Sequence, residues 1–408
     1  MNKFFSKLFS LSMLEQLSIN GGNFLFFIIS AKLVGPFEFG KFSILWMGTQ
    51  IIISISIPWI ALPITSKGID LENKAVILNA LKKIVYLSFL SPLLLIIYVF
   101  LIEEKIGWFE VVMMYFLGIC LVLFDGMRFF LVRNRAVKKA FFCNILKWIL
   151  AFLTLGFLFL DHELSKYSVL ILGIMLGTFV GVIVQFYFTR SYYFKLKDKG
   201  SSSERELDMS LFHLGISNLS NSVLTTILLT KVNLIVFGAL QAFRSLINIY
   251  PFILQYIESH FSAELIAKKK TSFISRKMIF IYTCFSLILM LVFSYYGEFI
   301  IKFIYGLDYV EYWKVFIFLF GIVSIQSLSR LVNIQNRLQN KNNVFNHSAI
   351  VLWFSTLIYA YLYVRDSKVD YYFILWIMLV TAIAQLFLYL NMIRNKFNEK
   401  KYPDKIFN

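Results

Sequence analysis

The sequence predicts an all-α polytopic membrane protein with about twelve transmembrane helices in two six-helix lobes. Of its 408 residues, 59% are hydrophobic and only 15% are charged, whereas soluble domains are about 45–50% apolar and about 25% charged. Apolar runs recur along the whole chain at roughly the 20-residue length that crosses the hydrocarbon core of a bilayer. These runs lack the alternation of barrel strands, so helices are the expected spanning elements.

The apolar runs define twelve predicted spans. They cover residues 12–34, 41–64, 84–102, 109–132, 144–160, 167–189, 211–236, 239–262, 278–296, 313–335, 346–364 and 371–393. The seventh and eighth are the least distinct, because Lys231 and Arg244 interrupt the apolar run and little polar sequence separates the two.

The distribution of basic residues gives this map an orientation. If the N-terminus is cytoplasmic, 30 of the 40 Lys and Arg residues fall on the cytoplasmic side and 8 on the other. Cytoplasmic loops carry such an excess of positive charge. The asymmetry persists to the C-terminus, so we expect an even number of spans and both termini in the cytoplasm. The formal charge of +17 therefore indicates topology, and we expect no nucleic-acid partner.

The polar segment near the middle of the chain divides it into lobes. Residues 190–210 contain the run Lys-Asp-Lys-Gly-Ser-Ser-Ser-Glu, a composition typical of flexible linkers. Six predicted spans lie on each side, as in transporters built from repeats. We predict an N-terminal lobe over 1–189, a cytoplasmic linker over 190–210, a C-terminal lobe over 211–396 and a cytoplasmic tail over 397–408.

Basic residues inside the predicted spans are candidate substrate contacts. A charge at the centre of a membrane helix costs roughly 2.5–3.5 kcal/mol on insertion scales, which makes it a functional hypothesis. Lys231 and Arg244 lie on consecutive helices, and Lys32 and Lys41 flank the first helical hairpin. Facing an interior cavity, these side chains would bind a phosphate group. The alternative is that they snorkel to the membrane interface.

Acidic residues in the spans are candidates for gating or coupling. Glu15 lies near the cytoplasmic end of the first span, where it could bind a coupling cation or belong to a solvated helix end. Asp125 and Arg128 are three residues apart and can meet on one helix face. A local ion pair is the simpler interpretation of that spacing, and a gate or a coupling carboxylate is the sharper one.

Motifs of catalysis and cofactor binding are missing from the sequence. It contains no Walker A loop, no G-x-S-x-G and no H-E-x-x-H. The four histidines are scattered and the three cysteines are not spaced as a disulfide framework or a zinc site. We therefore expect a protein that is not an enzyme and that uses no cofactor or metal.

The first hairpin carries a family resemblance. Residues 31–42 read Ala-Lys-Leu-Val-Gly-Pro-Phe-Glu-Phe-Gly-Lys-Phe, which resembles the basic, Leu-Leu-Gly-Pro and Phe-Gly pattern of polysaccharide transporters. Residues 230–234 (Thr-Lys-Val-Asn-Leu) and 243–246 (Phe-Arg-Ser-Leu) are similar to the seventh and eighth helices of that family. The chain looks like a Wzx-type O-antigen flippase of the MATE-like exporter superfamily. Asn233 stands where many relatives carry an acidic residue, which weakens ion coupling at that position.

The resemblance implies a substrate and a mechanism. The substrate would be an undecaprenyl-pyrophosphate-linked oligosaccharide, moved from the cytoplasmic to the periplasmic leaflet of the bacterial inner membrane. It also implies a V-shaped pair of lobes with a basic lumen and alternating access, in which Lys32, Lys41, Lys231 and Arg244 would contact the pyrophosphate. Membrane lipids, an O-antigen polymerase and a chain-length regulator would be its expected partners.

Three other interpretations remain open at the level of the sequence. A MATE-type small-molecule antiporter would share the fold but would favour cationic substrates and carboxylates in its lumen. A peptidoglycan-precursor flippase would share the chemistry but would usually have fourteen spans. A membrane polysaccharide polymerase or ligase would need a sizeable periplasmic loop with catalytic Arg or His, and the predicted outer loops are short.

Overall fold

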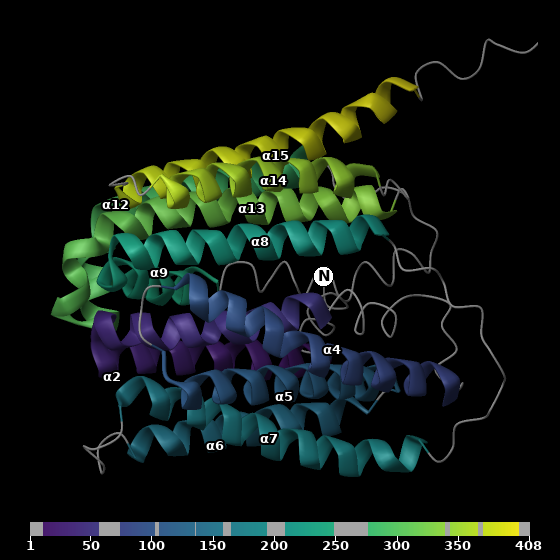
Figure 1. Cartoon of the computed structure of the whole chain (residues 1–408). Helices are drawn as coiled ribbons and strands as arrows, with labels where there is room; N and C mark the ends of the chain where they lie inside the picture. Colours follow the sequence, from purple (N-terminus) through teal and green to yellow (C-terminus); the bar gives the residue numbers. More distant parts are fainter. Residues whose placement is uncertain are drawn as a thin grey trace, which may run out of the picture. The chain divides into compact units, whose positions relative to one another are not determined.

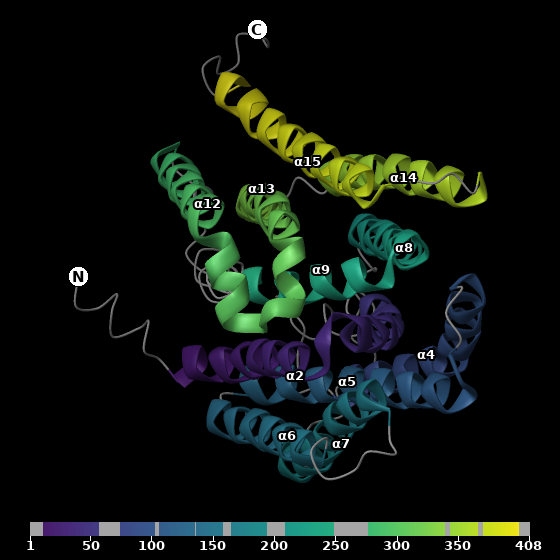
Figure 2. The ribbon, with the colours of Figure 1, turned by 90° about the vertical axis from the view of Figure 1, so that its left-hand side faces the viewer.

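The described part of the chain is almost entirely α-helical. This computed structural model describes residues 11–56, 74–102, 106–134, 136–157, 165–193, 209–248, 276–338, 343–365 and 370–399, and within those ranges it contains no β-strand. The chain is therefore an all-α protein, as its composition predicts. The helices (Figures 1 and 2) are α2 (Leu11–Ser56), α4 (Lys74–Leu101), α5 (Trp108–Arg133), α6 (Val137–Phe157), α7 (Lys166–Tyr193), α8 (Met209–Val232), α9 (Leu234–Ile247), α12 (Arg276–Tyr305), α13 (Trp313–Leu338), α14 (Asn343–Val364) and α15 (Tyr371–Glu399), with a 3-10 helix η3 (Leu307–Tyr312).

Many of these helices have the length and composition of membrane spans. Within the described ranges, nine helices are long and apolar enough to cross a bilayer, counting α2 once. Each of the twelve predicted ranges contains part of a described helix. Helix α9 is apolar but shorter than a full span, and its predicted continuation to residue 262 lies outside the described residues. The protein is thus a multi-pass membrane protein, while the number twelve stays a prediction.

Large apolar side chains are exposed along several helices, as lipid-facing positions require. Helix α12 is the clearest case, because Phe280, Tyr295, Phe299 and Phe303 are all more than half exposed. Soluble proteins rarely expose contiguous apolar patches of this kind. Hydrocarbon chains of a bilayer would cover these side chains without cost.

A glycine divides α2 into the two spans that the sequence predicts. Gly35 has a φ of 79°, a left-handed conformation that interrupts the helix, and glycine adopts it without the steric penalty of a Cβ atom. The predicted spans leave residues 35–40 as a loop, but within this range only Gly35 departs from helical geometry. The helix resumes at Pro36, because proline fits the first turn of a helix. The two segments pack on each other, with the ring of Phe27 5.2 Å from that of Trp46.

The chain divides into two compact units, residues 1–242 and 243–408. The first contains α2, α4 to α8 and the beginning of α9. Its core lies where α5, α6 and α7 pack together beneath α2 (Figure 2). This division falls within α9 and does not coincide with the predicted linker 190–210, of which residues 194–208 lie outside the described residues. The predicted assignment of functional lobes stays a prediction.

The second unit is held by aromatic packing. The ring of Phe243 contacts those of Tyr305, Tyr309 and Phe316 at centroid distances of 5.8, 6.2 and 5.7 Å. Gly306, with a φ of 100°, makes the turn between α12 and η3. Helices α13 and α15 pack together, and a ring contact at 5.0 Å joins Phe318 to Trp376.

Candidate functional site

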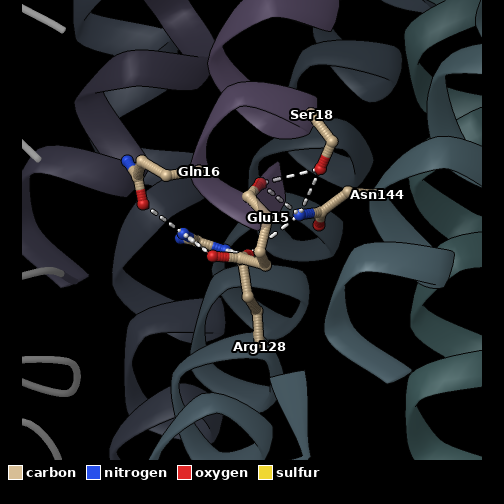
Figure 3. Close-up of polar contacts among 5 residues, drawn as sticks. All are labelled: Glu15, Gln16, Ser18, Arg128 and Asn144. Atoms are coloured by element: carbon tan, nitrogen blue, oxygen red, sulfur yellow. Dashed lines mark hydrogen bonds and ion pairs between the residues drawn. The ribbon is translucent and has the colours of Figure 1, made fainter. Parts of the chain in front are cut away.

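A buried ion pair joins α2 to α5 in the first unit (Figure 3). The guanidinium of Arg128 contacts both carboxylate oxygens of Glu15: Nε donates to Oε1, and Nη2 donates to Oε2 at 3.2 Å. Glu15 is 3% exposed and Arg128 6%. The two-point geometry matters here, because the free-energy cost of burying two charges is offset only when they are well paired and further hydrogen-bonded.

Three polar side chains complete this pair. Asn144 of α6 donates through Nδ2 to Glu15 Oε1 at 2.9 Å and to the Glu15 carbonyl at 3.2 Å. Ser18 Oγ donates to the same carbonyl at 2.7 Å. Arg128 Nη2 also donates to Gln16 Oε1 at 2.8 Å. The network therefore ties α2, α5 and α6 together (Figure 3).

Asp125 does not form the local ion pair with Arg128 that its spacing predicts. Among the described residues, the one ion pair of Arg128 is with Glu15, and Asp125 makes none. Glu15 occupies the guanidinium instead, with Nε of Arg128 donating to one carboxylate oxygen and Nη2 donating to the other. Asp125 is half-buried and interacts at longer range with Arg128, Lys147 and Glu15.

Lys147 belongs to the same cluster, although it is not among the predicted gating or coupling residues. It lies on α6 and is 4% exposed. Its ammonium is 4.8 Å from the ring centroids of Phe124 and of Trp148, a cation–π arrangement. We call Glu15, Asp125, Arg128 and Lys147 the charge cluster; its two acids balance its two bases. The signal in the sequence that could have pointed to Lys147 is a lysine one turn after an asparagine within an apolar run.

Lys41 makes cation–π contacts with aromatic rings of the first unit. Its ammonium lies 4.6 Å from the ring of Phe37 and 5.6 Å from that of Tyr167 at the start of α7. The Tyr167 hydroxyl donates to Glu110 Oε1 of α5 at 3.3 Å. These contacts connect the second segment of α2 to the beginnings of α5 and α7.

The other predicted basic contacts lie at or near the break in α2 and on α9. Lys32 is exposed on α2, three residues before Gly35. Lys231 is half-buried in the last turn of α8. Arg244 is exposed in the last turn of α9 and belongs to the second compact unit. In the described part of the chain, the side chains of Lys32 and Arg244 have no carboxylate partner.

Close backbone contacts place the junction of α8 and α9 against the break in α2. A Cβ atom on Gly238 would lie 1.9 Å from the carbonyl oxygen of Pro36, and one on Gly40 would lie 2.7 Å from that of Leu234. Lys231 precedes Leu234 by three residues, so the structure brings it to the same end of the first unit as Lys32 and Lys41.

Asn233 has a structural role that its place in the sequence did not reveal. It stands between α8 and α9, and its Oδ1 accepts hydrogen bonds from the backbone N–H groups of Ile235 at 2.9 Å and Val236 at 3.2 Å. This is the pattern of an N-cap, which asparagine favours. The amide at this position therefore serves to start α9.

Comparison of the whole chain with protein-family models and with curated proteins found no match.

Proposed function

We propose that the protein is a flippase for an undecaprenyl-pyrophosphate-linked oligosaccharide, such as an O-antigen or capsule repeat unit. It would act in the bacterial inner membrane with both termini in the cytoplasm, and would move the substrate to the periplasmic leaflet by alternating access. The hairpin motif over 31–42 and the positive-inside distribution support this proposal from the sequence.

The observation that carries the proposal is a contrast between two sets of charges. In the charge cluster, each carboxylate is balanced by a cation of the same unit. Lys32 and Arg244, in otherwise apolar helices, have no carboxylate partner among the described residues. A cation at membrane depth without a counter-ion is expensive, and an anionic headgroup would supply that counter-ion. A transporter of cations would instead need carboxylates without a cationic partner.

The chemistry of the proposed substrate suits such a protein. Its pyrophosphate is anionic, its sugars are polar, and its polyprenyl tail is apolar. Lys32, Lys41, Lys231 and Arg244 would act on the headgroup, with Arg binding phosphate at two points and Lys as a point charge. The tail would remain in the bilayer beside exposed apolar helices such as α12. The proposal includes no catalytic step and no cofactor.

The test is glycan export by a Lys32→Ala/Arg244→Ala variant. Each charge-assisted hydrogen bond contributes about 1.5–3 kcal/mol, so we expect surface glycan to fall by at least about tenfold. The lipid-linked oligosaccharide should accumulate in the inner membrane. Lys302→Ala, which removes an exposed lysine from the last turn of α12, is the matched control and should export normally.

Normal surface glycan in the double variant, at wild-type protein levels in the membrane, would remove these two residues from the substrate path. Accumulation of a different substrate class in a deletion strain would remove the flippase assignment itself.

A further inference from the structure

Several polar groups in the core of the first unit have no hydrogen-bond partner in the part of the chain that the structure describes. They are completely buried side chains on α6 and α7: the Oδ1 atom of Asn144, both amide atoms of Gln185 and the Oγ1 atom of Thr178. Each buried polar group without a hydrogen bond costs free energy. Four such atoms within one small core therefore need an explanation.

Helix packing brings two of these side chains to the level of the charge cluster. A Cβ atom on Gly181 of α7 would lie 2.6 Å from the ring of Phe124 and 3.7 Å from the Cβ of Lys147. Helices α5 and α7 run in one direction and α6 in the other. One turn further along this direction come Gln185 on α7, Arg128 on α5 and Asn144 on α6. Gln185 is fully buried at this level of the unit.

Asp125 and Lys147 are both without a direct polar contact. In the described structure, Asp125 makes no hydrogen bond or ion pair, and the ammonium of Lys147 meets only the two aromatic rings. The two charges nevertheless interact electrostatically. Their carboxylate and ammonium are thus near enough to attract and too far apart to bond.

We propose that bound water occupies this site and bridges Asp125 to Lys147 and to the amides of Asn144 and Gln185. Water both donates and accepts, and so fits a site that offers an ammonium, a carboxylate and amide groups together. The charge cluster is already balanced, so a neutral ligand suits it better than a further cation.

Such a water would contact three helices, because Asp125 lies on α5, Asn144 and Lys147 lie on α6, and Gln185 lies on α7. The consequence is that the network of α2, α5 and α6 extends to α7, so four helices of the first unit are held together by polar contacts. This inference does not depend on what the protein transports.

Hydroxyl-radical footprinting by X-ray irradiation of the purified full-length protein tests for the water directly. Radicals form from water close to a side chain, so buried Phe124 should be labelled severalfold faster than Phe42. Both rings are 0% exposed, which makes Phe42 the matched control. Equal, slow labelling of the two would mean that the site is dry and would overturn the proposal.

A double-mutant cycle tests the bridge between the charges. Asp125→Asn or Lys147→Met alone leaves a charge uncompensated and should lower the melting temperature by several degrees. The double variant should recover part of that loss. Strictly additive losses would show that the two charges are not coupled. A melting temperature that rises in sodium chloride relative to choline chloride would show a bound cation instead, and would equally reject water.

Discussion

Arg128 has two carboxylates within electrostatic range and bonds the one that is far away in the sequence. Glu15 lies on another helix and presents both of its carboxylate oxygens to the guanidinium. Such a bidentate pair satisfies more of the buried hydrogen-bonding capacity than a single contact to Asp125 would. Asn144 then fixes the carboxylate from a third helix. The choice of partner is thus decided by geometry rather than by spacing.

Removing Arg128 should therefore destabilise the protein strongly. Arg128→Ala leaves Glu15 buried without its cation, and breaking a buried pair in this way costs about 3–5 kcal/mol. Thermal unfolding of the purified protein, monitored by size-exclusion chromatography, measures the loss of stability. Arg365→Ala is the control, because Arg365 is exposed at the end of α14 and its removal should change stability little. Equal effects of the two substitutions would contradict a structural role for the buried pair.

At the scale of helices, glycine decides which elements approach closely. Helix α6 packs on α7 where Gly173 and Gly177 leave no room for a side chain, with a hypothetical Cβ at 2.1 Å from Thr154 Oγ1 and 2.2 Å from the Lys147 carbonyl oxygen. Helix α9 starts against α2 in the same way, at Gly238. Small residues permit such contacts between membrane helices, where the hydrophobic effect gives no preference for one packing over another.

Enlarging Gly238 should disturb the junction of α9 with α2. A Cβ atom there would meet backbone atoms of Pro36 and Gly40, which cannot turn aside as a flexible side chain could. Overpacking of this kind costs about 1–3 kcal/mol, so Gly238→Ala should lower the melting temperature.

The control for this prediction is Gly21→Ala. A Cβ atom on Gly21 of α2 meets nothing within 4 Å, and alanine is a better helix former than glycine by roughly 0.5–1 kcal/mol. Gly21→Ala should therefore leave stability unchanged or raise it. If both alanine variants were equally stable, close packing at Gly238 would not be what positions α9.

At the scale of the molecule, the predicted membrane topology rests on charge. The excess of Lys and Arg on one predicted face alternates correctly over the whole chain only if the number of spans is even. The boundary between the two compact units falls within α9, whereas the predicted lobes are divided at residues 190–210. Division by contacts and division by predicted spans therefore place the boundary at different points in the chain.

Reporter fusions test the topology. Fusions after Lys199 and after Asn398 should both be active as cytoplasmic reporters and inactive as periplasmic ones. Lys199 lies in the predicted linker and Asn398 near the C-terminus, so each samples a different half of the chain. A periplasmic signal at either position would contradict the predicted topology.

Much of the fold was predictable because a bilayer leaves few alternatives. Without water to satisfy backbone groups, a long apolar run must be helical. Helices α5 and α7 begin and end within a few residues of the predicted spans, whereas α4 begins ten residues before its predicted start and α12 ends nine residues beyond its predicted end. The break at Gly35 was also foreseeable from a Gly-Pro pair between two apolar runs. The cap formed by Asn233 was not, since an asparagine between two apolar runs has several uses.

The site was less predictable. Glu15, Asp125 and Arg128 stood out because charge is rare in membrane helices, but their partners did not. Lys147, Asn144 and Gln185 lie on helices whose faces are known only once α6 and α7 are packed. The sequence by itself determined the helical, membrane-spanning class, because hydrophobic length and charge act locally along the chain. Only the tertiary structure decided that Arg128 bonds Glu15 rather than Asp125, because the relative position of two helices depends on side chains distributed over all their neighbours.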